Sequence, residues 1–221
     1  MRFLVINPNC TASMTDTIAE AAEGAASAGT HIVARNPVGG PAAIQGPEDG
    51  TAALPGLFDL FRSEVLDTGA YDAAIIACFD DTGLWELKQR ASIPVIGIGE
   101  AAFHAAMLVG QRFSVVTTLA VSVPVIEENL KRYGFAERCA RVRASGVPVL
   151  DLENDPESSI RAIRNAISAA IAEDNCDAIV LGCAGMADLP LQLTEEFGLP
   201  VIDGVAAAIS LAEAIHNCGA A

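Results

Sequence analysis

The chain has 221 residues, of which 52% are hydrophobic, and it carries 13 basic against 28 acidic residues for a net charge of −15. This length suits one α/β domain or two small lobes, and the composition excludes an intrinsically disordered chain. So acidic a protein repels nucleic acid and anionic lipid, and we expect neither as a partner. The sequence also lacks the stretch of roughly 18 apolar residues that a membrane-spanning helix needs.

The start of the chain and its cysteines bear on the cellular compartment. Residues 3–6 form too short an apolar run for a signal peptide, and Asn7-Pro8-Asn9 follows at once. Six cysteines lie at positions 10, 78, 139, 176, 183 and 218, and no two of them make a C-x-x-C pair. We therefore expect a cytoplasmic protein with free thiols.

Short apolar strands alternate with helical segments along the first half of the chain. We expect strands at residues 3–6, 31–35, 73–77 and 94–98, and helices at residues 14–28, 52–66 and 84–90. Residues 36–50 are rich in glycine and proline and predict a long loop, and Pro55 limits the first turn of the helix that follows. This alternation is typical of a parallel sheet with helices on both faces.

The same alternation begins again at residue 113, after a helix predicted over residues 99–110. We expect strands at residues 113–117, 139–143, 178–182 and 200–203, and helices at residues 123–133, 157–172, 189–196 and 205–216. Asp155-Pro156 is a typical start signal for the second of these helices.

Two aligned segments indicate that the halves are related. Residues 71–78 (YDAAIIAC) match residues 176–183 (CDAIVLGC), and Pro-Val-Ile recurs at 94–96 and 200–202, an offset of 105 or 106. Any two strand–helix–strand units look somewhat alike, but the recurrence in phase favours an internal duplication. We therefore predict an α/β fold of two pseudo-symmetric lobes, each a short parallel sheet flanked by helices. The first lobe would hold residues 1–97 plus 206–221, with the final helix packing back on it, and the second residues 98–205.

Cys78 and Cys183 each end the third predicted strand of their half. Ligands of open parallel sheets bind outside the carboxyl ends of strands, so two facing lobes would place both thiols on one cleft. A structural role is the better interpretation for the other four cysteines. The turns after Cys78 and Cys183 also lead into helices, whose N-termini favour a thiolate.

Several kinds of chemistry use paired cysteines. A reducing cytoplasm argues against a disulfide, the spacing is too long for a typical metal site, and no metal is predicted. Nucleophilic catalysis would want a nearby histidine, and His31, His104 and His216 offer no clear partner. Acid–base chemistry on both faces of one carbon remains, with one thiolate removing a proton and the opposite thiol delivering one.

Two other motifs carry less weight. The G-x-G-x-x-A pattern that begins at Gly97 lacks the acidic residue that a dinucleotide site wants about 20 positions on. A pyridoxal enzyme needs a Schiff-base lysine, and Lys88 and Lys131 both fall on predicted polar helix faces.

Four stretches make the sequence resemble the aspartate/glutamate racemase superfamily, within it the hydantoin and allantoin racemases most closely. They are Asn7-Pro8-Asn9, Gly40-Pro41-Ala42-Ala43-Ile44, Cys78-Phe79-Asp80-Asp81 and Gly182-Cys183-Ala184-Gly185-Met186. Thr82 is a departure, since a proline often follows the aspartate pair in hydantoin racemases. The resemblance implies two pseudo-symmetric lobes with the active site between them, catalytic Cys78 and Cys183, and no cofactor.

The resemblance also suggests where substrate binds. Phe79 and Ala184 follow the cysteines where the amino-acid racemases have polar residues, which suits a neutral ring. Thr117 and Thr118 end a strand and would hydrogen-bond a ring carbonyl or merely cap, and Asp80 would orient an N–H group or cap the next helix. The full set of expected substrate-binding residues is Asn7, Pro41, Phe79, Asp80, Thr117, Thr118, Gly182, Ala184, Gly185 and Met186.

These observations favour a cofactor-independent racemase of 5-substituted hydantoins or allantoin. The alternatives are a decarboxylase or cis–trans isomerase of the same superfamily, which would have lost or repurposed one cysteine, and a non-catalytic small-molecule binding protein. The sequence does not choose between allantoin and other hydantoins. We also expect a homo-oligomer, because the composition leaves much apolar surface.

Overall fold

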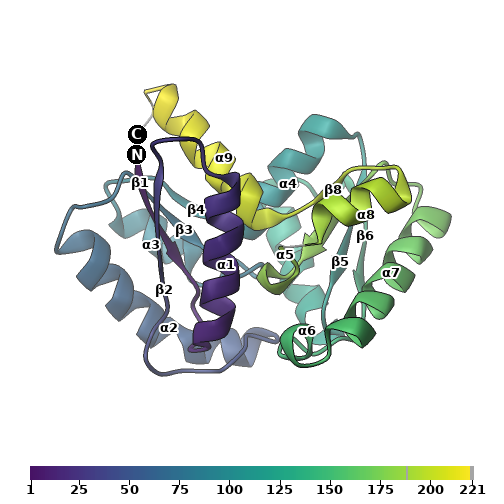
Figure 1. Ribbon diagram of the computed structural model, residues 1–221, viewed down its shortest axis with the longest axis horizontal. Helices are drawn as coiled ribbons and strands as arrows, with labels where there is room; N and C mark the ends of the chain where they lie inside the picture. The colour runs from purple at the N-terminus through teal and green to yellow at the C-terminus, as the bar shows by residue number, and fades with distance from the viewer. Residues whose placement is uncertain (188, 220–221) are drawn as a thin grey trace.

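The computed structural model describes residues 1–187 and 189–219 and consists of two α/β halves side by side (Figure 1). The first half contains strands β1 Arg2–Ile6, β2 His31–Arg35, β3 Ala73–Ile76 and β4 Val95–Gly97. The second contains β5 Phe113–Thr117, β6 Cys139–Ala144, β7 Ala178–Gly182 and β8 Val201–Ile202. Each half forms its own parallel sheet, in the order β2-β1-β3-β4 and β6-β5-β7-β8. The equivalent strand orders confirm the predicted fold of two pseudo-symmetric lobes.

Helices connect the strands within each half. The first half has α1 Ala12–Ala25, α2 Pro47–Phe61, α3 Leu84–Arg90 and α4 Ile98–Val109. The second has α5 Val123–Tyr133, α6 Asp151–Asn154, α7 Pro156–Glu173, α8 Pro190–Phe197 and α9 Gly204–Asn217, with short 3-10 turns at Ala120–Ser122 and Ala184–Met186. The carboxylate of Asp155 accepts from the backbone N–H of Ser158, so this residue caps α7 as its sequence position indicates.

The prediction for residues 36–66 is wrong in two respects. Helix α2 begins at Pro47, five residues before the predicted start, because a proline at the first helical position loses no hydrogen bond. Glu48 and Asp49 in the first turn also favour this start through the helix dipole. Pro55 lies inside the helix, and a π-helical turn at Arg62–Leu66 completes the segment. The short helix α6 was not predicted either.

The hydrophobic core joins the two lobes. Both faces of each sheet are covered. The central strands β3, β5 and β7 are buried along their whole length. One continuous cluster of buried side chains runs from β1 and β3 through α4 and α9 to β5 and β7. Phe103 of α4 lies at its centre, packed edge-on against Phe79 and stacked on Phe113.

Helices α4 and α9 leave the two sheets at equivalent points and pack on each other, and α9 also packs on α1 (Figure 1). Glu213 of α9 accepts hydrogen bonds from the hydroxyls of Ser27 and Thr30, at 2.7 and 2.6 Å. These contacts support the proposed division of the chain into residues 1–97 with 206–221 and residues 98–205, which stays a prediction.

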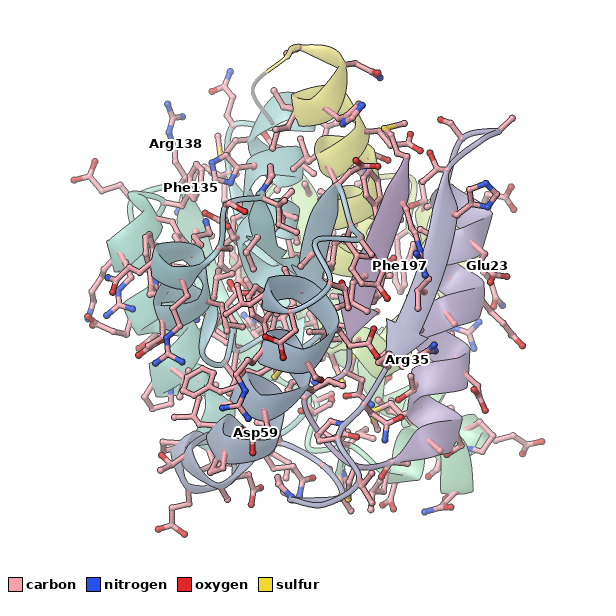
Figure 2. All side chains as sticks on the ribbon, turned by 90° about the vertical axis from the view of Figure 1, so that its left-hand side faces the viewer. Glu23, Arg35, Asp59, Phe135, Arg138 and Phe197 are labelled. Atoms are coloured by element: carbon pink, nitrogen blue, oxygen red, sulfur yellow. The ribbon has the colours of Figure 1, made fainter. Side chains whose placement is uncertain are left out.

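Figure 2 shows the outer side of the first lobe, where Glu23 of α1 and Asp59 of α2 point away from the core. In the described part of the chain, no helix is long and apolar enough to cross a membrane.

Candidate active site

A small cavity of about 30 Å³ lies where the carboxyl ends of β3, β5 and β7 meet. It contains both Cys78, which follows β3, and Cys183, which follows β7. The residues that line it are Asn9, Met14, Ile44, Ala77, Cys78, Phe79, Asp80, Thr117, Thr118, Ser122, Val149, Gly182, Cys183 and Ala184. Side chains from both lobes therefore enclose the two thiols.

The two cysteine turns have the same backbone arrangement. The backbone N–H group of Asp80 lowers the pKa of the Cys78 thiol, and that of Gly185 lowers the pKa of the Cys183 thiol, in each case against the larger effect of burial. In each turn this N–H group is two residues beyond the cysteine, and the next N–H group donates to the cysteine carbonyl, from Asp81 at 2.9 Å and from Met186 at 3.1 Å. Both sulfurs thus have one backbone dipole placed to stabilise a negative charge.

The surroundings of Cys78 differ from those of Cys183 in their polar side chains. The hydroxyl of Thr82 lies 3.5 Å from the Cys78 sulfur. The carboxylate of Asp80 faces the cavity, and its nearest hydrogen-bond donor is the Ser122 hydroxyl at 3.4 Å. At the position equivalent to Asp80 the second lobe has Gly185, so the cavity carries one carboxyl group on the Cys78 side only.

Burial dominates the acid–base properties of both thiols. It raises the pKa of Cys183 to about 11, with a smaller contribution from the Asp80 charge, and the Gly185 N–H only partly opposes it. Burial raises the pKa of Cys78 further, and the Asp80 charge adds to this. This effect of burial on the pKa outweighs the expectation that helix N-termini favour a thiolate. Both cysteines rest as neutral thiols at pH 7.

Asp80 itself titrates near neutrality. Burial raises its pKa to about 7, and the hydroxyl of Ser122 opposes this shift. The charge that the thiols face therefore changes within the ordinary pH range.

The model of the Asp/Glu/Hydantoin racemase family matches residues 3–212. The chain belongs to this family. It is 46% identical over 219 residues to the hydantoin racemase of Rhizobium meliloti, a match that covers 99% of this chain and 90% of that relative. Among solved structures, the allantoin racemase from Klebsiella pneumoniae superposes with a TM-score of 0.95 at 42% identity, covering 99% of this chain and 89% of that one. These similarities confirm the predicted family and identify the protein as an isomerase of the racemase type.

More distant relatives share the fold alone. The crystal structure of arylmalonate decarboxylase has a TM-score of 0.62 and 15% identity to this chain, over 96% of this chain and 91% of that one. The fold alone therefore does not decide the reaction, which depends on the residues within the cavity.

Six of the ten expected substrate-binding residues line the cavity of this family member. They are Phe79, Asp80, Thr117, Thr118, Gly182 and Ala184. The Thr117 hydroxyl donates to the carbonyl of Gly182 at 3.0 Å and so ties β5 to β7 beside Cys183. A side chain at Gly182 would crowd Thr117, so the glycine permits this close approach.

The structure places the other four expected residues away from the cavity wall. The amide of Asn7 donates to Asn9 and Thr15 and holds the loop between β1 and α1. Met186 is buried in the core on the far side of the second sheet. The carbonyl of Pro41 accepts from the Cys10 N–H, and Gly185 contributes its backbone N–H to Cys183.

Six lining residues were not among the sequence-based candidates: Asn9, Met14, Ile44, Ala77, Ser122 and Val149. Asn9 and Ile44 lie within stretches that carried the family resemblance, so a signal for them existed. For Met14, Ser122 and Val149 no motif was available, because only the packing of one lobe on the other brings them to the site.

Loops from the two lobes close over the cavity. The Gln45 side-chain carbonyl accepts from the N–H of Val149 at 2.9 Å, and the Ser13 hydroxyl donates to Glu153 at 2.7 Å. These two hydrogen bonds join the lobes beside the cavity.

Proposed function

We propose that the protein is a cofactor-independent racemase of 5-substituted hydantoins or allantoin, with Cys78 and Cys183 as the acid and base at ring carbon C5. The observation that carries this proposal is the placement of the two thiols. They occupy equivalent positions of duplicated lobes and line one cavity, each with a backbone N–H group at its sulfur. Two such groups suit proton removal from one face of a carbon and delivery to the other.

The proposed reaction has two proton transfers. A thiolate takes the proton from C5, an S–H bond forms, and the electron pair of the C–H bond moves into the adjacent ring carbonyl as an enolate. The opposite thiol then donates its proton to the other face of C5 and becomes the thiolate. The next turnover can run in the reverse direction, so no external acid or base is consumed.

The cavity lining fits a neutral ring. Met14, Ile44, Phe79, Val149 and Ala184 supply apolar contacts, while Asp80 gives one hydrogen-bond acceptor for a ring N–H group. The Asp80 and Gly185 N–H groups lower the thiol pKa values, so they stabilise the thiolate rather than the enolate. Hydantoins and allantoin share the ring and differ in the 5-substituent, and both remain within the proposal.

A polarimetric screen tests the proposed activity. Enantiopure allantoin and 5-alkyl or 5-benzyl hydantoins should lose optical rotation in the presence of the protein, and their C5 proton should exchange with deuterium in D₂O. A binding protein without turnover would cause neither change. A decarboxylase would release CO₂ from an aryl malonate and leave the rotation of every hydantoin as it was, which would contradict the proposal.

The charge of Asp80 should govern the pH dependence of the reaction. Since proton removal needs a thiolate and burial holds the pKa of Cys183 at about 11, kcat/KM should rise with pH through the neutral range. Asp80→Asn removes the negative charge that raises both thiol pKa values, so the rising limb should move to lower pH. A displacement of one pH unit would correspond to about tenfold in rate on that limb.

The difference between wild type and Asp80→Asn should appear above pH about 7, because below it the wild-type carboxyl is already neutral. Asp59→Asn, on the exposed face of α2, is the matched control and should leave the pH profile of kcat/KM in place. A rising limb that stays unchanged in Asp80→Asn, or moves to higher pH, would show that this charge does not act on the thiols.

The proposal extends to assembly and compartment. An apolar groove runs between α1, α4, α8 and α9, and two of its lining residues, Leu108 and Leu191, are 80% and 83% exposed. We propose that a second copy of the chain covers it in a homo-oligomer, in a cytoplasm that keeps the thiols reduced. Size-exclusion chromatography with light scattering should give a multiple of 22.8 kDa, and the mass of one chain would contradict this.

A further inference from the structure

Asp81 follows the Cys78 turn but does not line the cavity. Its buried carboxylate accepts three hydrogen bonds, from the N–H groups of Gly99 and Glu100 at 3.0 and 2.8 Å and from the Tyr133 hydroxyl at 2.7 Å. Gly99 and Glu100 belong to the first turn of α4, and Tyr133 is the last residue of α5. One side chain thus joins the Cys78 turn to the helix that links the lobes and to a helix of the second half.

The equivalent helix that follows the second sheet, α9, is capped in the ordinary way. Asp203 directly precedes α9, and its carboxylate accepts from the N–H groups of Val205 and Ala206 at 3.0 and 2.7 Å. The repeat offset of 106 places Gly97 at the corresponding position before α4. Asp81 therefore caps the same two N–H positions of α4 from outside that helix.

The contact between Asp81 and the N-terminus of α4 explains why residues 97 and 99 are glycines. A side-chain carbon at Gly97 would overlap the Asp81 carboxylate, and one at Gly99 would meet the carbonyl of Phe79 and the other Asp81 oxygen. The Gly97-Ile98-Gly99 stretch resembles part of a nucleotide-binding motif. In the structure its two glycines leave room for the Cys78 turn to pack against the N-terminus of α4. The N-terminus of α4 and the Cys78 turn are therefore in direct contact.

Hydrogen bonds from within the turn and from the second lobe fix the backbone of the Cys78 turn. Asp81 has a φ of +50°, a left-handed conformation that costs a residue with a side chain and must be held by its surroundings. Its N–H donates to the carbonyl of Cys78 at 2.9 Å. From the second lobe, the Asn129 amide donates to the carbonyl of Asp80 at 2.8 Å, one helical turn before Tyr133.

We propose that Asp81 is a positioning residue that fixes Cys78 for proton transfer, and that Tyr133 ties this position to the second lobe. The inference rests on the proposed function, since it assigns Cys78 a proton-transfer role. Asp81 acts through the turn and does not touch the substrate. The residue equivalent to Asp81 in the second lobe is Met186, which is buried among apolar side chains, so the Cys183 turn has no such carboxylate.

This difference gives an experiment with an enantiomer-specific result. The loss of the C5 proton into D₂O is followed by NMR from each enantiomer separately, for wild type, Asp81→Asn, Tyr133→Phe, Cys78→Ser and Cys183→Ser. Asp81→Asn should slow exchange at least about tenfold for the enantiomer that Cys78→Ser also fails to exchange, a loss of the size expected for a misplaced catalytic group. Exchange of the other enantiomer should stay within about threefold of wild type.

Tyr133→Phe keeps the cap on α4 and removes one hydrogen bond, so it should show the same preference for one enantiomer with a smaller loss. The fluorescence of the single tryptophan, Trp85, which stacks on Tyr133, shows whether Asp81→Asn folds. If that variant does not fold, Tyr133→Phe provides the test. Asp203→Asn is the matched control. It weakens the equivalent cap on α9, which Asp203 makes from that helix's own N-cap position rather than from a cysteine turn, so any loss should affect both enantiomers equally.

The outcomes separate this inference from the function on which it rests. If wild type exchanges neither enantiomer, the proposed function fails and the inference falls with it. If the cysteine variants behave as predicted but Asp81→Asn and Tyr133→Phe slow both enantiomers equally, or slow the one that Cys183→Ser loses, the positioning role alone is wrong.

Discussion

Cys78→Ser should abolish proton removal from one enantiomer of the substrate, and Cys183→Ser should abolish it from the other. A serine hydroxyl is far too weak an acid or base to replace a thiol, so neither variant should complete racemisation. Each missing proton transfer should reduce the rate by about 10²–10⁴-fold. Each variant should still exchange the C5 proton of one enantiomer, because the surviving thiolate can remove it and return a deuteron to the same face.

The measurement uses enantiopure substrate in D₂O, with NMR for exchange and polarimetry for racemisation. Cys218→Ser is the control, since Cys218 is exposed beyond the end of α9 and should be replaceable without loss. Near wild-type racemisation by either active-site variant would rule out the paired-thiol mechanism. Loss of exchange for the same enantiomer in both variants would show that the cysteines do not serve opposite faces of C5.

Phe103→Ala should produce the largest loss of stability among substitutions outside the site. The Phe103 side chain is fully buried in the cluster shared by both lobes. Its ring lies 5.5 Å from that of Phe79, next to Cys78, and 5.7 Å from that of Phe113 on β5. Its removal leaves a cavity between the lobes, and the free energy of unfolding should fall by about 3–5 kcal/mol.

Urea denaturation of wild type, Phe103→Leu and Phe103→Ala measures this effect. Phe103→Leu keeps most of the buried volume and should lose less than half as much as the alanine variant. A loss under about 1 kcal/mol for Phe103→Ala would mean that the two lobes do not depend on this shared core.

Much of the site follows from the sequence because parallel strands bring their carboxyl ends together. The repeat around Cys78 and Cys183 predicted that both thiols follow third strands, and the structure places them on one cavity. The same rule pointed to Thr117, which ends the first strand of the second half, and to Thr118, which follows it, and both line the cavity.

Other features depend on tertiary packing and left no local signal. Asn7 and Asn9 lie two residues apart in one loop and hydrogen-bond to each other, yet only Asn9 lines the cavity, and no local pattern in the sequence distinguishes them. Asp81 is 16 residues before Gly97 in the sequence, and nothing in either stretch indicates that they touch. The raised thiol pKa values likewise arise from the closure of two lobes, which outweighs the backbone N–H group at each sulfur.

The isotope content of the first product molecules tests the two-base mechanism most directly. Wild-type protein is given one enantiomer of a hydantoin substrate in D₂O, and both enantiomers are analysed at low conversion. If two thiols act on opposite faces, the product enantiomer carries deuterium at C5 from its first appearance, while the unreacted enantiomer retains hydrogen. Product that keeps the substrate's own hydrogen, or unreacted substrate that gains deuterium as fast as product forms, would mean that a single base serves both faces and would contradict the account.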